Sequence, residues 1–323
     1  AQAWPEEGEI RYRAGIILLA DARPKEAVAE LEVGCKRLPT ARCSAALAHG
    51  LLDLGREAEA RRELGKILDR SPRPADIARG RQLIRRLLRR HQRIPDKARK
   101  LFMAAQRKLL QTDNAASALA NLRELAIDFP NLGPAHTLRG LAHLRLGNLA
   151  QAVAAFGRAA KGSVDARNHY YLGVIYRARR QPDAAIRHYQ RALALDPFLW
   201  RAAVQLGRLL GARGRHKEAA SLLDRLVVLA PSHVARRMAG RASMQAGDLE
   251  RAEKHFRKLL AREPRDFEAH LRLAQILLRL NREGPAARRA SALSDAREHA
   301  AEAASLRPTD PEVKLLLRRI RGR

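Results

Sequence analysis

Apolar side chains recur along this chain at intervals of three and four residues, which is typical of helices with one apolar face. Turn-forming stretches that contain proline separate one apolar stretch from the next. Most intervals between these prolines are one or two units of about 34 residues, the length of a pair of short helices. The prolines concerned are Pro39, Pro72, Pro130, Pro197, Pro231, Pro264 and Pro308. The pattern predicts an all-α chain built from repeated helix pairs.

Small residues hold fixed places within the predicted helix pairs. A glycine falls in the middle of each first helix, where it costs about 1 kcal/mol relative to alanine, so we expect it to allow close approach of a neighbouring helix. In each second helix an alanine is followed by a bulky residue, which we expect to fill the space between repeats. The glycines are Gly140, Gly173, Gly207 and Gly240, and the alanine and bulky pairs are Ala152 with Phe156, Ala185 with Tyr189, Ala219 with Leu223 and Ala252 with Phe256.

This pattern resembles the tetratricopeptide repeat over nearly the whole chain. The clearest copies are residues 133–165, 166–199, 200–232 and 233–266, and looser copies are residues 8–40, 41–74, 99–132 and 267–310. The resemblance implies a right-handed α-solenoid of about eight helix–turn–helix repeats, in which no single repeat is stable by itself. We expect residues 311–321 to form a C-terminal capping helix with a polar outer face.

Two segments depart from the repeat and suggest four regions along the chain. Residues 1–74 carry N-terminal repeats, 75–98 an extra basic amphipathic helix, 99–310 the core repeats and 311–323 the basic capping helix. Residues 281–292 lengthen the connection inside the last repeat, where Asn281, Gly284 and Pro285 predict a loop.

The extra helix has two interpretations. It carries an apolar stripe opposite a basic face, so it could lie on an anionic membrane or pack its stripe on adjacent repeats. The stripe is Ile77, Leu83, Ile84, Leu87 and Leu88, and the basic face is Arg79, Arg81, Arg85, Arg86, Arg89, Arg90 and Arg93. Packing is the favoured interpretation, and the arginines stay available to a partner in either case.

Positive charge dominates the composition and points to an anionic partner. The 323 residues include 63 Lys and Arg against 34 Asp and Glu, a formal net charge of +29. The resemblance implies that first helices line an inner groove, and it places a basic series there: Arg107, Tyr170, Arg177, Arg208, Arg237, Arg241 and Arg272. Guanidinium groups bind carboxylates in a bidentate fashion, so we expect an acidic protein segment as ligand. The alternatives are a merely solvated basic surface and, as second choice of partner, nucleic acid.

No catalytic, cofactor or metal site is evident. The chain has no phosphate-binding glycine loop, nucleophile elbow, paired-histidine zinc motif or C-x-x-C. His136, His169 and His270 fall at one repeat position, which favours packing over metal binding because metal ligands must converge. We expect a non-enzymatic scaffold without cofactors, although a catalytic domain outside this sequence stays an alternative. No apolar run reaches the length of about 18 residues that a transmembrane helix requires.

The two cysteines bear on the compartment. Cys35 and Cys43 flank the turn at Pro39, where neighbouring helices can meet at disulfide distance, and such a bond persists in oxidising compartments. Two unrelated buried thiols are the alternative. The opening Ala1-Gln2-Ala3 matches the small-x-small pattern read by signal peptidase. We therefore expect a periplasmic or secreted protein of a Gram-negative bacterium, serving a multi-protein envelope or surface assembly; the alternative is a cytoplasmic scaffold on RNA or DNA.

Overall fold

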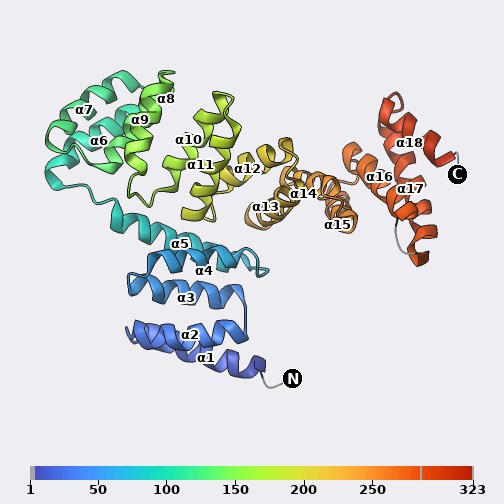
Figure 1. Ribbon diagram of the computed structural model, residues 1–323, viewed down its shortest axis with the longest axis horizontal. Coiled ribbons are helices and arrows are strands. Elements are labelled where there is room, and N and C mark those ends of the chain that lie inside the picture. The colour runs from blue at the N-terminus through green and yellow to red at the C-terminus, as the bar shows by residue number, and fades with distance from the viewer. Residues whose placement is uncertain (1–3, 284–285, 322–323) are drawn as a thin grey trace. The chain divides into compact units, whose positions relative to one another are not determined.

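The computed structural model describes residues 4–283 and 286–321, and within those residues it contains 18 α-helices and no strand (Figure 1). The expected all-α tetratricopeptide-like architecture is thereby confirmed. The chain divides into two compact units, Ala1–Ala202 and Ala203–Arg323.

The helices are short and follow one another through brief turns. The first nine are α1 Trp4–Ala20, α2 Pro24–Arg37, α3 Ala41–Asp53, α4 Glu57–Ile67, α5 Pro74–His91, α6 Asp96–Leu110, α7 Ala115–Asp128, α8 Gly133–Arg145 and α9 Leu149–Ala160. The other nine are α10 Ala166–Ala178, α11 Pro182–Leu195, α12 Trp200–Ala212, α13 His216–Leu229, α14 His233–Gln245, α15 Leu249–Leu260, α16 Phe267–Glu283, α17 Ala286–Leu306 and α18 Pro311–Arg321.

Several helices begin where the sequence supplies a partner for their free N–H groups. The side chains of Thr40, Asn114 and Ser232 accept hydrogen bonds from the third backbone N–H beyond them, at the starts of α3, α7 and α14. Helices α2, α5, α11 and α18 instead place proline in the first turn, where a missing N–H costs nothing. These local signals fix the boundaries of the repeated hairpins.

In the first unit, successive helices pack as antiparallel hairpins, namely α1 with α2, α3 with α4, α6 with α7, α8 with α9 and α10 with α11. Helix α5 interrupts this order and packs on α3 and α4, while α4 also contacts α11. Segments far apart in the sequence therefore lie side by side in this unit (Figure 1).

The apolar stripe of α5 is buried inside the first unit. Ile77, Leu83, Ile84 and Leu87 are all buried, in accord with the packing interpretation. At Gly80 an added Cβ would lie 2.3 Å from Cζ of Phe198, so only glycine lets the backbone of α5 approach this ring. The stripe is thus occupied by protein and offers no apolar face to a membrane.

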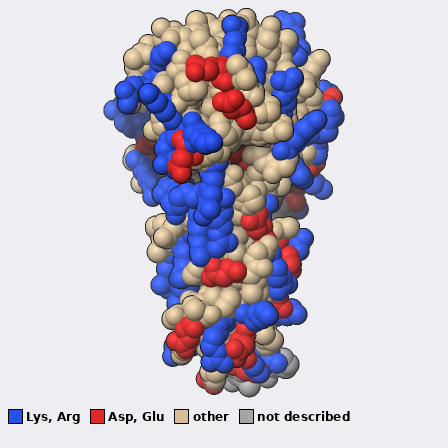
Figure 2. All heavy atoms as spheres, turned by 90° about the vertical axis from the view of Figure 1, so that its left-hand side faces the viewer, with Lys and Arg blue, Asp and Glu red and all other residues tan. Residues whose placement is uncertain are grey.

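The basic face of α5 is partly used within the same unit. Arg86 pairs with Asp53 at 2.8 Å, and Arg90 donates to the carbonyl oxygen of Leu52 at 2.8 Å. Figure 2 nevertheless shows a band of Lys and Arg side chains at the level of α5. Basic surface therefore persists here after these internal contacts are made.

In the second unit, α13 to α18 pack in sequence, and α16 contacts α14, α15, α17 and α18. The expected loop at residues 281–292 is largely wrong, because α16 continues to Glu283 and α17 begins at Ala286. Leu277 and Leu280 of α16 and Ala292 of α17 are buried in one cluster, so the extra residues lengthen two packed helices. Gly284 and Pro285 lie outside the described residues. Helix α18 buries Val313, Leu316 and Ile320 against this unit, as expected of a capping helix.

Close helix contact at the repeat glycines leads to the first testable prediction. A Cβ added at Gly173 would lie 2.6 Å from Cε1 of Tyr189, whose side chain is fully buried. Gly173→Ala should therefore lower the free energy of unfolding by about 1–2 kcal/mol, because overpacking outweighs the better helix propensity of alanine. Urea unfolding followed by circular dichroism measures the change.

Gly157 supplies the matched control for this substitution. It lies in α9 of the same unit and has no atom within 4 Å of an added Cβ. Gly157→Ala should raise the free energy of unfolding by about 0.5–1 kcal/mol through helix propensity alone. A stabilising effect at both positions would show that the Tyr189 ring can move away and that the close contact is not required.

Candidate functional site

The predicted groove residues fall in both units. In the first unit, Arg107 is exposed on α6 and Tyr170 is half-buried on α10, with its ring centroid 5.3 Å from that of Tyr171. Arg177 is exposed at the end of α10. Burial raises the pKa of the Tyr189 hydroxyl to about 12, and the charge of Arg177 acts in the opposite direction.

In the second unit, Arg208 is exposed on α12, but three other groove arginines pair with carboxylates. Arg237 pairs with Asp266 and Glu268, Arg241 with Glu268, and Arg272 with Glu312 at 2.7 Å. The acidic partners stand at or just before the starts of α16 and α18, one repeat beyond the arginines. These arginines are therefore partly neutralised by neighbouring repeats, which the sequence prediction did not consider.

The paired arginines line a wide polar pocket of about 870 Å³. Acidic and basic side chains alternate around it, and Arg307 lies over the Phe267 ring at 4.3 Å from the ring centroid. Because Arg237, Arg241 and Arg272 already have carboxylate partners, this pocket has a mixed rather than a purely basic character.

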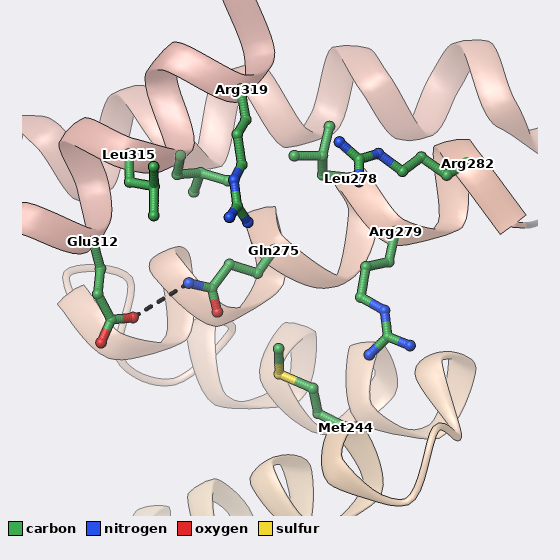
Figure 3. A pocket seen from close by; sticks show the side chains of 9 residues that line it. Met244, Gln275, Leu278, Arg279, Arg282, Glu312, Leu315 and Arg319 are labelled. Atoms are coloured by element: carbon green, nitrogen blue, oxygen red, sulfur yellow. Dashed lines mark hydrogen bonds between the residues drawn. The ribbon is translucent and has the colours of Figure 1, made fainter.

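A second pocket, of about 410 Å³, adjoins the first at Glu312, which lines both. It is formed by α14, α16 and α18 (Figure 3). Its lining consists of Met244, Gln275, Leu278, Arg279, Arg282, Glu312, Leu315, Leu316 and Arg319. Apolar side chains from three helices thus meet arginines from α16 and α18 in a single hollow.

The arginines of the second pocket differ in their partners. Arg279 lies 3.6 Å from Glu283, and Gln275 donates to Glu312 at 3.3 Å, the contact drawn in Figure 3. Arg282 and Arg319 have neither an ion pair nor a side-chain hydrogen bond among the residues that the structure describes. The pocket therefore combines an apolar lining with two cations whose hydrogen-bonding capacity is unused.

The repeat register could have revealed part of this pocket. Arg319 stands eight residues after the first residue of α18, as Arg208 and Arg241 do in α12 and α14. Arg279 and Arg282 extend the face of α16 that Arg272 begins. The apolar contribution of Met244 and Leu315 carried no sequence signal, because exposed apolar residues are common on protein surfaces.

The structure places the two cysteine sulfurs 2.07 Å apart, at disulfide distance, and their Cα atoms 5.4 Å apart. Cys35 lies in the last turn of α2 and Cys43 in the first turn of α3. This separation is short enough for the expected disulfide, which would close the turn at Pro39.

The three histidines at the shared repeat position make hydrogen bonds inside the protein. Nε2 of His136 donates to the carbonyl oxygen of Pro130, and Nε2 of His270 to that of Pro264, each at 2.8 Å. Nδ1 of His169 lies 3.1 Å from Nδ1 of His188. Among the described residues no three His, Cys, Asp or Glu side chains gather to hold a metal ion. Nor is any helix in this part of the chain long and apolar enough to cross a membrane.

Comparison with known proteins adds evidence for the family. The tetratricopeptide-repeat family models match residues 166–199 and 243–307. No curated protein matches the sequence closely enough to count as a relative.

Three solved structures represent the structural similarity. MamA is 22% identical with a TM-score of 0.45, over 53% of this chain and 94% of that chain. PilW, described as a widely conserved type IV pilus biogenesis factor, is 20% identical with a TM-score of 0.41. The match covers 69% of this chain and 100% of the PilW chain. YrrB, described as a TPR protein with an unusual peptide-binding site, is 22% identical with a TM-score of 0.45. The match covers 52% of this chain and 88% of the YrrB chain.

The same residues produce both the repeat pattern in the sequence and the packing of the helix pairs. The fixed Gly, Ala and aromatic positions that predict the hairpins are also the contacts that hold them together, such as Gly173 against Tyr189 and Gly240 against Phe256. Stacked hairpins of this type form extended surfaces for protein partners. The chain contains tetratricopeptide repeats at residues 166–199 and 243–307, and repeats of this kind support a scaffold for protein–protein interaction.

Proposed function

We propose that the second unit binds an acidic and partly apolar segment of a partner protein in the pocket between α14, α16 and α18. The observation that carries this proposal is the pair Arg282 and Arg319, which line an apolar hollow without carboxylate partners among the described residues. Two unpaired cations beside apolar side chains favour a ligand that supplies both carboxylates and an apolar anchor.

The lining of the pocket supports both parts of such a ligand. Leu315 is 49% exposed and lines the same pocket as Leu278 and Met244, so an apolar side chain of the ligand would remove apolar surface from water. A guanidinium presents a planar fork that matches a carboxylate, and Arg282 and Arg319 belong to different helices. Two carboxylates spaced around one apolar residue would use both helices at once.

The remaining groove arginines contribute to different degrees. Arg208 is exposed and has no ion pair among the described residues, so it is available to extend the acidic contact. Arg237, Arg241 and Arg272 must first be released from Asp266, Glu268 and Glu312. In the first unit Arg107, Tyr170 and Arg177 form a further candidate surface for the same class of ligand.

The cellular setting belongs to the same proposal. A disulfide between Cys35 and Cys43 supports export to an oxidising compartment, and hence a periplasmic or secreted scaffold of an envelope or surface assembly. The scaffold itself carries out no catalysis in this proposal.

A cytoplasmic scaffold bound to RNA or DNA is the second candidate. The net charge of +29 and the band of Lys and Arg at the level of α5 favour it (Figure 2). Arg85→Glu with Arg89→Glu should then weaken binding of a random-sequence RNA or DNA oligonucleotide. Variants of the pocket in the second unit should leave this binding unchanged.

The test of the peptide proposal uses short synthetic peptides in which Asp and Leu contents vary independently. The fluorescence anisotropy of labelled peptides should show binding only when both residue types are present. Arg282→Glu with Arg319→Glu should weaken this binding by at least about a hundredfold, because two charge-assisted contacts are replaced by repulsion. Raising the salt concentration should weaken wild-type binding as well.

Arg297→Glu provides a control with the same charge change at an exposed position of α17 that does not line the pocket. It should keep wild-type affinity, and all variants should keep the wild-type circular dichroism spectrum. Equal binding of the Asp–Leu peptide by the wild type and the double variant would overturn the proposal. So would equal binding of peptides with and without Leu.

A further inference from the structure

Glu312 lies at the boundary between the two pockets of the second unit and lines both of them. It belongs to the first turn of α18, and its side chain is 54% exposed. In the view of Figure 3 it lies on the opposite side of the second pocket from Arg279 and Arg282, with Gln275 between them. A ligand that extends from the second pocket into the wide polar pocket therefore passes this carboxylate.

Within the described part of the chain, only one oxygen of this carboxylate accepts hydrogen bonds. Oε2 of Glu312 accepts from Nη1 of Arg272 at 2.7 Å and from Nε2 of Gln275 at 3.3 Å. Oε1 has no hydrogen bond among the residues that the structure describes. Because both oxygens of a carboxylate can accept, Glu312 keeps one acceptor for a donor from outside the protein.

The partners of Glu312 hold its side chain at this boundary. Nη1 of Arg272 also donates to Oε1 of Gln275 at 2.9 Å, so side chains of α16 and α18 are joined by three hydrogen bonds. A ligand carboxylate that approached Arg272 would stand close to Glu312, and two negative charges repel each other. The arrangement therefore opposes an acidic ligand residue at this point and favours a basic one.

The charge of the lining changes at Glu312. Among the described residues, the second pocket is lined by three arginines and by one carboxylate, that of Glu312. The described lining of the wide polar pocket has five arginines and five carboxylates, so its formal charges cancel. The lining therefore attracts acidic ligand residues in the second pocket and gives them no net attraction beyond Glu312.

We propose that the ligand carries a basic residue beside its acidic and apolar part, and that the carboxylate of Glu312 binds this residue. The inference rests on the proposed peptide site in the second pocket and adds the order of charges along the ligand. An ammonium or guanidinium group can donate to Oε1 of Glu312 while Oε2 stays bonded to Arg272 and Gln275. Glu312 then selects among acidic partners, because a further acidic residue at this point is repelled.

A series of labelled synthetic peptides tests the order of charges. Each peptide contains the Asp and Leu residues of the proposed ligand, and a further position on either side of the Leu holds Lys, Ala or Glu. At one such position, fluorescence anisotropy should show about two- to fivefold tighter binding of the Lys peptide than of the Ala peptide, as expected of an exposed ion pair. The Glu peptide should bind more weakly than the Ala peptide.

Glu312→Gln removes the charge but keeps an oxygen that can accept from Arg272. This variant should bind the Lys and Ala peptides equally, and the Ala peptide at least as tightly as the wild type does. Glu312→Lys should reverse the order, so that the Glu peptide binds more tightly than the Lys peptide. Glu302→Gln is the matched control, because Glu302 is an exposed residue of α17 outside the described lining of both pockets, and it should keep the wild-type order.

The possible outcomes separate this inference from the proposed function. Equal binding of the Lys, Ala and Glu peptides at every position would overturn the inference and leave the peptide site intact. So would a preference for Lys that persists in Glu312→Gln, because another carboxylate would then bind the basic residue. Tighter binding of the Glu peptide by the wild type would show that the ligand displaces Glu312 from Arg272, against the inference. Binding of none of the peptides would overturn the proposed function and this inference with it.

Discussion

Replacing Phe156 with alanine should lower the free energy of unfolding of the first unit by about 3–5 kcal/mol. The Phe156 side chain is fully buried, and its ring centroid lies 5.1 Å from that of Tyr171 in the next repeat. An added Cβ at Gly140 would lie 2.7 Å from this ring, so no space separates the ring from α8. The substitution would leave a cavity between two repeats, and nearest-neighbour contacts are what stabilise stacked repeats.

Phe156→Leu tests whether the cost arises from the cavity. Leu223 fills the equivalent position opposite Gly207 in a later repeat, so leucine is compatible with this geometry. The leucine variant should lose only about 1 kcal/mol. Urea unfolding gives both values, and amide hydrogen exchange should show the loss of protection concentrated in α8, α9 and α10. A loss below about 1 kcal/mol for Phe156→Ala would mean that the neighbouring helices collapse into the cavity.

The fold could be predicted from the sequence because its strongest contacts are local and repeated. The glycine, alanine and bulky residue of each hairpin recur at one spacing, so Gly140 against Phe156 and Gly173 against Tyr189 are two copies of one contact. The residues 166–199 expected to form one repeat coincide with a family match. The pattern stays recognisable when other positions of the sequence vary, because each hairpin is stabilised by contacts with its immediate neighbours only.

The charged surfaces could not be predicted in the same way. Whether Arg241 is free or paired depends on Glu268, a residue of the next hairpin whose direction is set by packing between repeats. The residues of the α14–α16–α18 pocket likewise come from three helices, and Met244 and Leu315 look like ordinary surface residues in the sequence. Repeat position gives the face on which an arginine lies, but not its ion-pair partner.

The same reasoning applies to α5. Its amphipathic pattern predicts a helix with one buried face, and the structure buries Ile77, Leu83, Ile84 and Leu87. That this helix also meets Phe198, more than a hundred residues later, depends on the return of α11 towards α4. A contact of that sequence separation has no periodic signal, because it occurs only once in the chain.

Removing the Cys35–Cys43 link should lower the free energy of unfolding by about 2–3 kcal/mol in the chain-entropy treatment of short closed loops. Both side chains are buried, at 5% and 0% exposure, so alanine is the conservative replacement at each position. Reduced wild type and Cys35→Ala with Cys43→Ala should show the same loss in urea unfolding. The loss should fall on α1 to α4, because stacked repeats respond mainly through their nearest neighbours.

Alkylation with and without prior reduction establishes the state of the two sulfurs in the native protein. Denatured protein should gain no alkyl group unless a reductant has been added first, and two groups afterwards, as read by mass spectrometry. The double alanine variant serves as the control, because reductant should change neither its mass nor its stability. If both cysteines are alkylated in protein isolated without reductant, the bond is absent in the cell. The proposal of an exported scaffold then loses its main physical support, and the cytoplasmic alternative becomes the one to test.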